Sequence, residues 1–274
     1  MDNGIQQKVS ILGCGWLGFS LAKRLLHDGF HVNGSTTSVN KLKELEDAGI
    51  KAYQLAYQPA QKADPQDFFN ADILFLNIPF SRQLKDPFIY LQQIAAVIND
   101  SRRGTIRFLI FAGTTGIYDE GMGEAREDAP LLLRTDRQQV LHQVEERLRQ
   151  EKKFKTTVLR FGGLVGPDRP VGKFLAGKKD LPDPNQRVNL IHRDDCVEIV
   201  TLIIKKNIQG EILNAVCDGH PTREALYTKA ARELNLPPPE FLTDQKTTPY
   251  KIVSNRRLKE RLGYSFLHPD PMKF

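Results

Sequence analysis

The feature that most constrains the fold lies at the start of the chain, where a glycine-rich turn joins a strand pattern to a helix pattern. Residues 8–12 form a short β-branched run, and Gly13-Cys14-Gly15-Trp16-Leu17-Gly18 follows it directly. Leucines then recur at helical spacing until Gly29 ends the pattern. A GxGxxG motif between a strand and a helix predicts the first turn of a dinucleotide-binding βαβ unit.

Each glycine of this motif has its own expected role. Gly13 makes the tight turn, Gly15 lets the backbone approach a pyrophosphate, and Gly18 allows close packing of helix and strand. The helix that begins at Trp16 and Leu17 offers amides and a partial positive charge to the phosphates. We therefore expect these five residues to bind the cofactor. The alternative is a purely structural glycine turn.

The end of the second expected strand bears on the choice of cofactor. Proteins that bind NAD usually carry Asp or Glu there to hold the ribose hydroxyls. This chain instead has Gly34-Ser35-Thr36-Thr37-Ser38, with Lys41 close behind. Thr36 and Thr37 are the hydroxyls expected to contact a 2′-phosphate, so NADP is favoured while NAD stays open. The competing explanation is that the segment caps the next helix, as Ser38 is expected to do.

Strand and helix patterns alternate along the first half of the chain, which predicts an α/β, Rossmann-type doubly wound parallel sheet. Strands are expected at 8–12, 30–32, 51–55, 73–78, 106–111 and 156–161, and helices at 16–28, 39–48, 87–100 and 134–150. After Gly166 the chain becomes rich in Pro, Gly and Lys. We expect a dinucleotide-binding domain over 1–166 and a smaller C-terminal substrate lobe over 167–274, interleaved with the first domain.

Composition narrows the class of protein. The chain of 274 residues is 40% hydrophobic and 26% charged, which is ordinary for a globular protein. Its net charge of +6 is dispersed and accompanied by no nucleic-acid motif, so no nucleic-acid partner is expected. No apolar run suits a membrane helix, and no signal-peptide pattern is present, which favours the cytoplasm. Three cysteines without metal spacing fit a reducing compartment.

Several segments, taken together, resemble a known family. They are 11–18, 111–118, 127–130 with Glu145, 159–167 and 189–195. In order along the chain, they resemble the extended short-chain dehydrogenases/reductases of the NAD-dependent epimerase/dehydratase type. More narrowly, and together with Phe174-Leu175-Ala176-Gly177-Lys178, they resemble the atypical YeeZ-like subgroup. The resemblance spans essentially the whole chain and implies an NAD(P)-dependent oxidoreductase or epimerase.

The resemblance also implies catalytic residues, with one departure. Thr114 falls at the family's catalytic Ser/Thr position, and Tyr118 ends the same motif. The family's Tyr-xxx-Lys pair, which combines an acid/base with a lysine that lowers its pKa, is not matched. Aligning on Glu145 places Arg137 at the tyrosine position and Leu141 at the lysine position. Any chemistry is therefore expected to run through Thr114, with Tyr118 as the weaker second candidate.

A small-molecule substrate, of an anionic kind, is the expected partner. Arg137 could hold an anionic group, and Arg169 and Lys173 lie on a basic loop that also includes Lys178. His192 lies in a segment that the resemblance places beside the active-site cleft. The alternatives are a solvated basic loop and, for His192, a helix-start role of Asp194 and Asp195 that explains part of its segment. No metal is expected, and the oligomeric state is left open.

Two hypotheses for function remain. The first is an NADP(H)-dependent enzyme with atypical catalytic residues. The second is a non-catalytic NADP(H)-binding regulator or redox sensor, for which Cys14 inside the glycine loop would be the reactive thiol. Loss of the Tyr-xxx-Lys pair favours the second hypothesis, and retention of the Thr114 motif favours the first.

Overall fold

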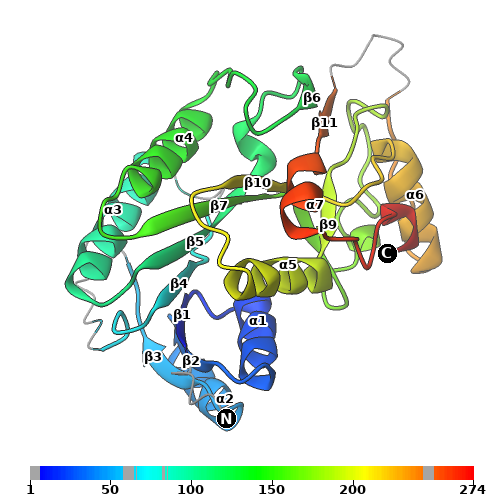
Figure 1. Ribbon diagram of the computed structural model, residues 1–274. Coiled ribbons are helices and arrows are strands. Elements are labelled where there is room, and N and C mark those ends of the chain that lie inside the picture. The colour runs from blue at the N-terminus through cyan, green and yellow to red at the C-terminus, as the bar shows by residue number, and fades with distance from the viewer. Residues whose placement is uncertain (1–6, 58–64, 66, 82–83, 85, 243–249) are drawn as a thin grey trace. The chain divides into compact units, whose positions relative to one another are not determined.

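The computed structural model describes residues 7–57, 65, 67–81, 84, 86–242 and 250–274 (Figure 1). Its central sheet confirms the predicted α/β fold. Seven strands lie in the order β10-β7-β5-β4-β1-β2-β3, and the pairs from β3 to β5 are parallel. This is the strand order of a Rossmann-type sheet, in which the chain reverses direction beside its first strand. The strands are β1 (Lys8–Leu12), β2 (His31–Thr36), β3 (Lys51–Gln54), β4 (Ile73–Leu76), β5 (Phe108–Thr114), β7 (Lys155–Phe161) and β10 (Ile212–Ala215).

Helices cover both faces of the sheet around β1, as a doubly wound fold requires. Figure 1 shows α3 and α4 side by side on one face, while α1 packs beside β1 and β2 on the other. The helices are α1 (Trp16–His27), α2 (Leu42–Asp47), α3 (Phe88–Arg103) and α4 (Asp136–Arg149). A capping box formed by Thr135 and Gln138 begins α4. All four side chains of β4 are buried, which explains its uninterrupted apolar sequence.

Strand pairing and hydrogen bonds place the ends of some strands and helices at residues other than those predicted from the sequence. β2 continues to Thr36 because it pairs with β1 on one side and with β3 on the other. β4 ends at Leu76 because Asn77 turns toward the glycine loop. The expected helix over 39–48 begins as a 3₁₀ turn, η1 (Val39–Lys41), before α2.

The chain divides into two compact units that interleave along the sequence. The first comprises Met1–Gly113, Thr135–Leu159 and Val200–Ile212. The second comprises Thr114–Arg134, Arg160–Ile199 and Leu213–Phe274. Each unit is therefore assembled from several stretches of chain. The division at residue 166 expected from composition stays a prediction.

The second unit adds two small parallel sheets and further helices. One sheet pairs β6 (Gly123–Ala125) with β11 (Lys251–Val253), and the other pairs β8 (Gly163–Val165) with β9 (Leu190–His192). The remaining elements are η2 (Thr115–Ile117), η3 (Val171–Lys173), α5 (Arg193–Lys205), α6 (Arg223–Glu233), α7 (Arg256–Leu262) and η4 (Pro271–Lys273). Among the described residues, no helix combines the length and the apolar character needed to cross a membrane.

Candidate functional site

Two glycines of the loop after β1 are required by packing within the protein. Gly13 has a φ of +100°, and a Cβ there would lie 2.5 Å from the carbonyl oxygen of Asn77. A Cβ at Gly18 would lie 2.4 Å from the carbonyl oxygen of Gly13. Asn77 follows β4 and donates from Nδ2 to the Gly13 carbonyl at 2.9 Å. The loop is thus fixed where β1 and β4 end together, at the reversal point of the sheet.

Gly15 differs from the other two, because the described residues leave open space where its side chain would lie. Apart from the adjoining backbone, a Cβ at Gly15 would meet no heavy atom of these residues within 4 Å. Gly15 is the N-cap residue of α1, and the first turn of that helix contains no acidic residue. The helix terminus therefore carries its partial positive charge uncompensated by a carboxylate of its own first turn. Such a cradle fits the pyrophosphate of a dinucleotide.

The side-chain hydroxyls at the end of β2 differ in their hydrogen bonds and in their exposure. Ser35 is buried, its Oγ accepts from Gly13 N at 3.0 Å, and its carbonyl accepts from Cys14 N at 2.7 Å. It therefore holds the glycine loop and is not available to a phosphate. Thr36 accepts from Ser38 N at 3.1 Å, whereas Thr37 is exposed. Ser38 occupies the N-cap position of η1 but makes no side-chain capping bond, so its expected capping role is wrong in that detail.

Cys14 points into the protein. Its thiol is buried against Gly34, where an added Cβ would lie 3.1 Å from Sγ. Burial, together with the nearby charge of Glu44, raises the pKa of Cys14 to about 12, and Lys41 opposes the shift. A thiol in this state is protonated at neutral pH and is a poor nucleophile.

Thr114 ends β5 and begins the short turn η2. Its Oγ1 accepts a hydrogen bond from Gly116 N at 3.1 Å, and its side chain is half-buried. The acceptor role leaves the hydroxyl proton directed elsewhere, so Thr114 can donate to an oxygen of a bound molecule. The backbone thus orients the hydroxyl at the position that the resemblance marks as catalytic.

Tyr118 lies in a buried polar cluster of the second unit. Its hydroxyl donates to Oδ1 of Asn214 at 2.8 Å and accepts from Nη1 of Arg160 at 2.7 Å. Glu127 continues the cluster by accepting from Asn214 N at 2.8 Å. Burial raises the pKa of Tyr118, an effect that Arg160 opposes, so the phenol stays protonated at neutral pH. Tyr118 is 1% exposed, and these contacts give its hydroxyl a structural role in the cluster.

A buried lysine supports the same turn. Lys251 of β11 directs Nζ to the carbonyl oxygens of Thr115 at 3.3 Å and Tyr118 at 3.4 Å. It also pairs with Glu120 at 2.8 Å. Asn189 in turn accepts from Val253 N and donates to the Lys251 carbonyl, which fixes the position of β11. The backbone that positions Thr114 is therefore tied to β11 by a charged group.

The positions that the resemblance assigns to the Tyr-xxx-Lys pair hold other contacts. The Arg137 guanidinium stacks on the Phe80 ring at 4.0 Å, and Nη2 donates to the Phe80 carbonyl at 2.8 Å. Nη1 of Arg137 donates a further hydrogen bond, 3.5 Å long, to the Ser81 carbonyl. Leu141 is buried. Arg137 therefore already has partners, and a role in binding an anion requires it to add a contact to these.

The predicted basic loop lies on the second unit. Arg169 is exposed and its guanidinium lies 5.7 Å from the centre of the Phe174 ring. Lys173 is exposed at the end of η3, and Lys179, next to Lys178, pairs with Glu240 at 3.1 Å. The side chains of Arg169 and Lys173 are thus exposed to solvent on this loop.

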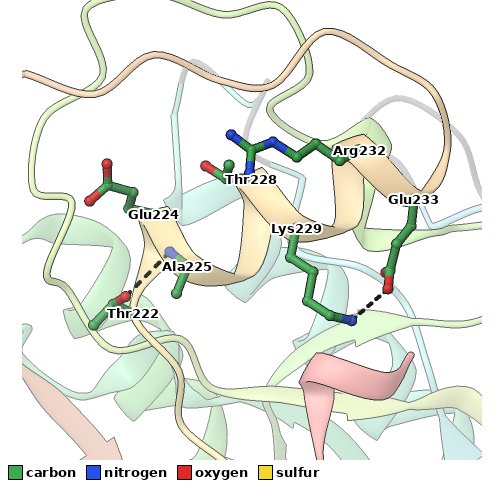
Figure 2. Close-up of a pocket in the computed structure, with 7 residues that line it drawn as sticks. All are labelled: Thr222, Glu224, Ala225, Thr228, Lys229, Arg232 and Glu233. Atoms are coloured by element: carbon green, nitrogen blue, oxygen red, sulfur yellow. Dashed lines mark hydrogen bonds and ion pairs between the residues drawn. The ribbon is translucent and has the colours of Figure 1, made fainter.

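A hollow lies beside α6 in this unit. Figure 2 shows its lining: Thr222, which caps the helix by accepting from Ala225 N at 3.3 Å, and the Lys229–Glu233 pair at 2.6 Å. The other lining residues are Glu224, Thr228 and Arg232. These residues are charged or small side chains along one helix, and we assign no chemistry to them.

His192 ends β9 and is buried. Its ring lies 3.8 Å, centre to centre, from the ring of His268, and its Nδ1 lies 3.6 Å from Oδ2 of Asp194. Burial lowers the pKa of His192, and His268 lowers it further. The expected role in substrate binding is not tested by these contacts and stays a prediction.

Several residues that build the site escaped the sequence analysis. Asn77, Asn214, Lys251 and His268 belong to no short motif, and Arg160 lies in the segment 159–167 but was not singled out there. Each acts on residues far away along the chain, as the Lys251–Thr115 contact illustrates. Only the position of Asn77 at the end of an apolar strand carries a signal, because strand ends at the reversal point line the ligand crevice.

The chain is similar to known proteins over nearly its whole length. No family model matches it. Protein YeeZ of Escherichia coli K12 is 33% identical over 269 residues, which are 97% of this chain and 98% of that protein. A functionally unknown conserved protein from Silicibacter pomeroyi has a similar structure, with a TM-score of 0.79, 19% identity, and coverage of 98% of this chain and 96% of that one.

Enzymes with bound dinucleotide share the fold as well. A UDP-glucuronic acid 4-epimerase from Bacillus cereus in complex with NAD matches with a TM-score of 0.78 and 15% identity, covering 94% of this chain and 91% of the epimerase. A short-chain dehydrogenase/reductase superfamily protein from Agrobacterium tumefaciens with bound NAD matches with a TM-score of 0.72 and 15% identity, covering 94% and 92%. At this identity the two structures are evidence of a common fold.

Proposed function

Because the chain belongs to the YeeZ family and is an atypical extended short-chain dehydrogenase/reductase, we propose that it binds a nicotinamide dinucleotide in the loop after β1. The observation that carries the proposal is the open space at Gly15. Gly13 and Gly18 are explained by the protein's own packing, whereas Gly15 has no neighbour that excludes a side chain. A glycine at this N-cap is explained if a ligand must approach the backbone.

The residues around the loop are proposed to have different roles in binding the dinucleotide. Gly15, Trp16, Leu17 and Gly18 offer the start of α1 to the pyrophosphate, while Gly13 sets the turn. Thr37 and Lys41, both exposed after β2, are the groups proposed to favour NADP over NAD. Thr36 contributes by shaping the turn through its bond to Ser38 N. The similar epimerase and dehydrogenase structures contain NAD, so NAD is the alternative cofactor.

The proposed reaction is a cofactor-dependent oxidoreduction or epimerisation of a small anionic substrate. The bound cofactor supplies hydride chemistry. Thr114 would donate a hydrogen bond to a substrate oxygen, where negative charge develops if a carbonyl is reduced, and the proton that this oxygen finally takes up would come from water. Tyr118, a protonated buried phenol, supports the turn that carries Thr114. Arg137, Arg169, Lys173 and His192 are the proposed contacts for the substrate, and they would select anionic groups through charge and hydrogen bonding.

Thr114 offers a direct test of the enzyme proposal. Reductase and epimerase substrates are screened with NADP(H) and NAD(H), and Thr114→Ala is compared with Thr114→Ser on any substrate that turns over. Removal of one oxyanion-type donor typically costs about 10²–10³ in rate, so we expect that loss for alanine and near-normal turnover for serine. Equal rates for the wild type and Thr114→Ala would refute the assignment.

A non-catalytic NADP(H)-binding regulator is the second candidate. It is favoured by one observation, that the position expected to hold the acid/base tyrosine carries Arg137 stacked on Phe80. Dinucleotide binding without turnover across the whole substrate screen would select this function. The redox-sensor version is disfavoured because the Cys14 thiol is buried and protonated.

A further inference from the structure

We propose that His192, Asp194 and His268 form a binding site for a divalent transition-metal ion of the Zn²⁺ class. The three side chains converge within the second unit from two distant stretches of sequence. Each offers one ligand atom, and all these atoms lie within 4.8 Å of one another. Two imidazoles and one carboxylate make up a donor set that Zn²⁺ uses in proteins. His192 and Asp194 lie close together in the sequence, but the third ligand, His268, shares no motif with them.

The distances match those of a metal site before any metal is added. Oδ2 of Asp194 lies 3.6 Å from Nδ1 of His192 and 3.6 Å from Nε2 of His268. Tetrahedral ligands at about 2.1 Å from zinc lie about 3.4 Å from one another. One carboxylate oxygen therefore already stands at nearly the required distance from both imidazoles. These separations exceed hydrogen-bond distance, and they correspond to ion pairs only if a histidine is protonated.

The protonation state of His192 is suited to ligation. Nδ1 of His192 accepts a long hydrogen bond of 3.3 Å from the backbone N–H of Asp194. An imidazole nitrogen that accepts must carry its lone pair rather than a proton. The lone pair is thus held on the side of the ring that faces the Asp194 carboxylate. A metal ion would replace a weak hydrogen bond there.

Neighbouring groups hold the chain around His268 in place. Oδ1 of Asp194 lies 3.7 Å from Nε of Arg193, within ion-pair but not hydrogen-bond distance, while Oδ2 faces the two histidines. The buried carboxylate of Asp195 accepts from His268 N at 3.1 Å, Leu267 N at 2.7 Å and the Tyr264 hydroxyl at 2.6 Å. These bonds fix the chain around His268 to the beginning of α5. Support of this kind keeps ligands oriented and is typical of metal sites.

The site has a protected side and an open side. The His192 side chain is only 11% exposed, whereas Asp194 is 48% and His268 is 37% exposed. An ion bound by these three residues would keep a coordination position for water or an anionic ligand on the open side. Three protein ligands with one open position is the arrangement of a reactive zinc site rather than a closed structural one.

Metal binding by the full-length protein tests the proposal. Equilibrium dialysis against Zn²⁺ should give one ion per chain for the wild type. His268→Gln and Asp194→Asn should each weaken binding at least about tenfold, since even changes outside the first ligand shell cost 10–100-fold. His27→Ala is the matched control, because His27 is 85% exposed and lies outside the cluster. It should bind as the wild type does.

A second measurement does not depend on the variants. Zinc titration should shift the imidazole nitrogen NMR signals of His192 and His268, and should leave those of His27 unchanged. Wild-type protein that retains no stoichiometric Zn²⁺, or that retains it equally in His268→Gln with unshifted His192 and His268 signals, would overturn the proposal.

Discussion

The Tyr118 hydroxyl donates to Oδ1 of Asn214 at 2.8 Å, joining residues 96 positions apart in the sequence. Tyr118 lies in the motif that the resemblance marks as catalytic, and Asn214 lies on β10. Arg160 donates to the same hydroxyl. The family motif therefore ends here in a residue that ties the turn after β5 to a buried polar cluster.

Tyr118→Phe should accordingly act on stability more than on cofactor binding. It removes the donor to Asn214 and one acceptor of Arg160 in a buried environment, which typically costs about 1–3 kcal/mol. We expect a fall of that size in the free energy of unfolding, measured with urea, and unchanged dinucleotide affinity. Tyr250→Phe, at a side chain that is 50% exposed, is the control and should leave stability unaltered. A Tyr118→Phe variant as stable as that control would contradict the cluster's structural role.

Lys251→Met should loosen the turn that carries Thr114. Methionine fills similar space but leaves the carbonyls of Thr115 and Tyr118 without their buried donor, at a typical cost of about 1–3 kcal/mol. We expect lower stability and faster hydrogen exchange at the amides of residues 115–118. Lys259→Met, which removes a partly exposed pair with Asp218, serves as the comparison. Unchanged exchange in the turn would show that Lys251 does not position it.

Cys14 should be unreactive in the folded protein. Its pKa of about 12 means that almost none of the thiol is ionised at pH 7–8, and the ionised fraction grows only as the pH rises toward that value. Treatment with iodoacetamide followed by mass spectrometry should label Cys14 only after denaturant is added. Rapid labelling of Cys14 in native buffer would restore the redox-sensor hypothesis.

Lys41→Ala should change cofactor preference. Lys41 is exposed after β2 and is proposed to meet a 2′-phosphate, which only NADP carries. Loss of one charge-assisted hydrogen bond is worth about tenfold in affinity, so NADP⁺ should bind about tenfold more weakly while NAD⁺ is unaffected. Lys43→Ala, on an exposed neighbour, is the control. An equal loss for both cofactors, or none, would count against the NADP assignment.

Local pattern predicted the sheet and the glycine loop because both depend on short stretches of sequence. The βαβ start at β1 and α1 was recognised from glycine spacing and leucine periodicity, and the strand order confirmed it. The partners of the loop could not be recognised in this way. Ser35 belongs to the segment in which a 2′-phosphate contact was expected, yet the fold turns its hydroxyl toward Gly13.

Long-range contacts were likewise not predictable for the motif that the resemblance marks as catalytic. The sequence placed Thr114 and Tyr118 together but could not distinguish their environments. The fold buries Tyr118 between Arg160 and Asn214 and leaves Thr114 half-buried at the end of a strand. Contacts between residues so far apart depend on the assembled second unit, and no spacing within one motif encodes them.

The most direct test of the account is dinucleotide binding by Gly15→Asp. Aspartate is a favourable N-cap residue, and a Cβ at this position meets no atom within 4 Å, so the variant should fold with a melting temperature at or above the wild-type value. The carboxylate would occupy the cradle and repel the pyrophosphate. Calorimetric titration with NADP⁺ and NAD⁺ should show binding by the wild type, tighter for NADP⁺, and none by folded Gly15→Asp. Binding of either dinucleotide by Gly15→Asp with wild-type affinity would contradict the proposed site.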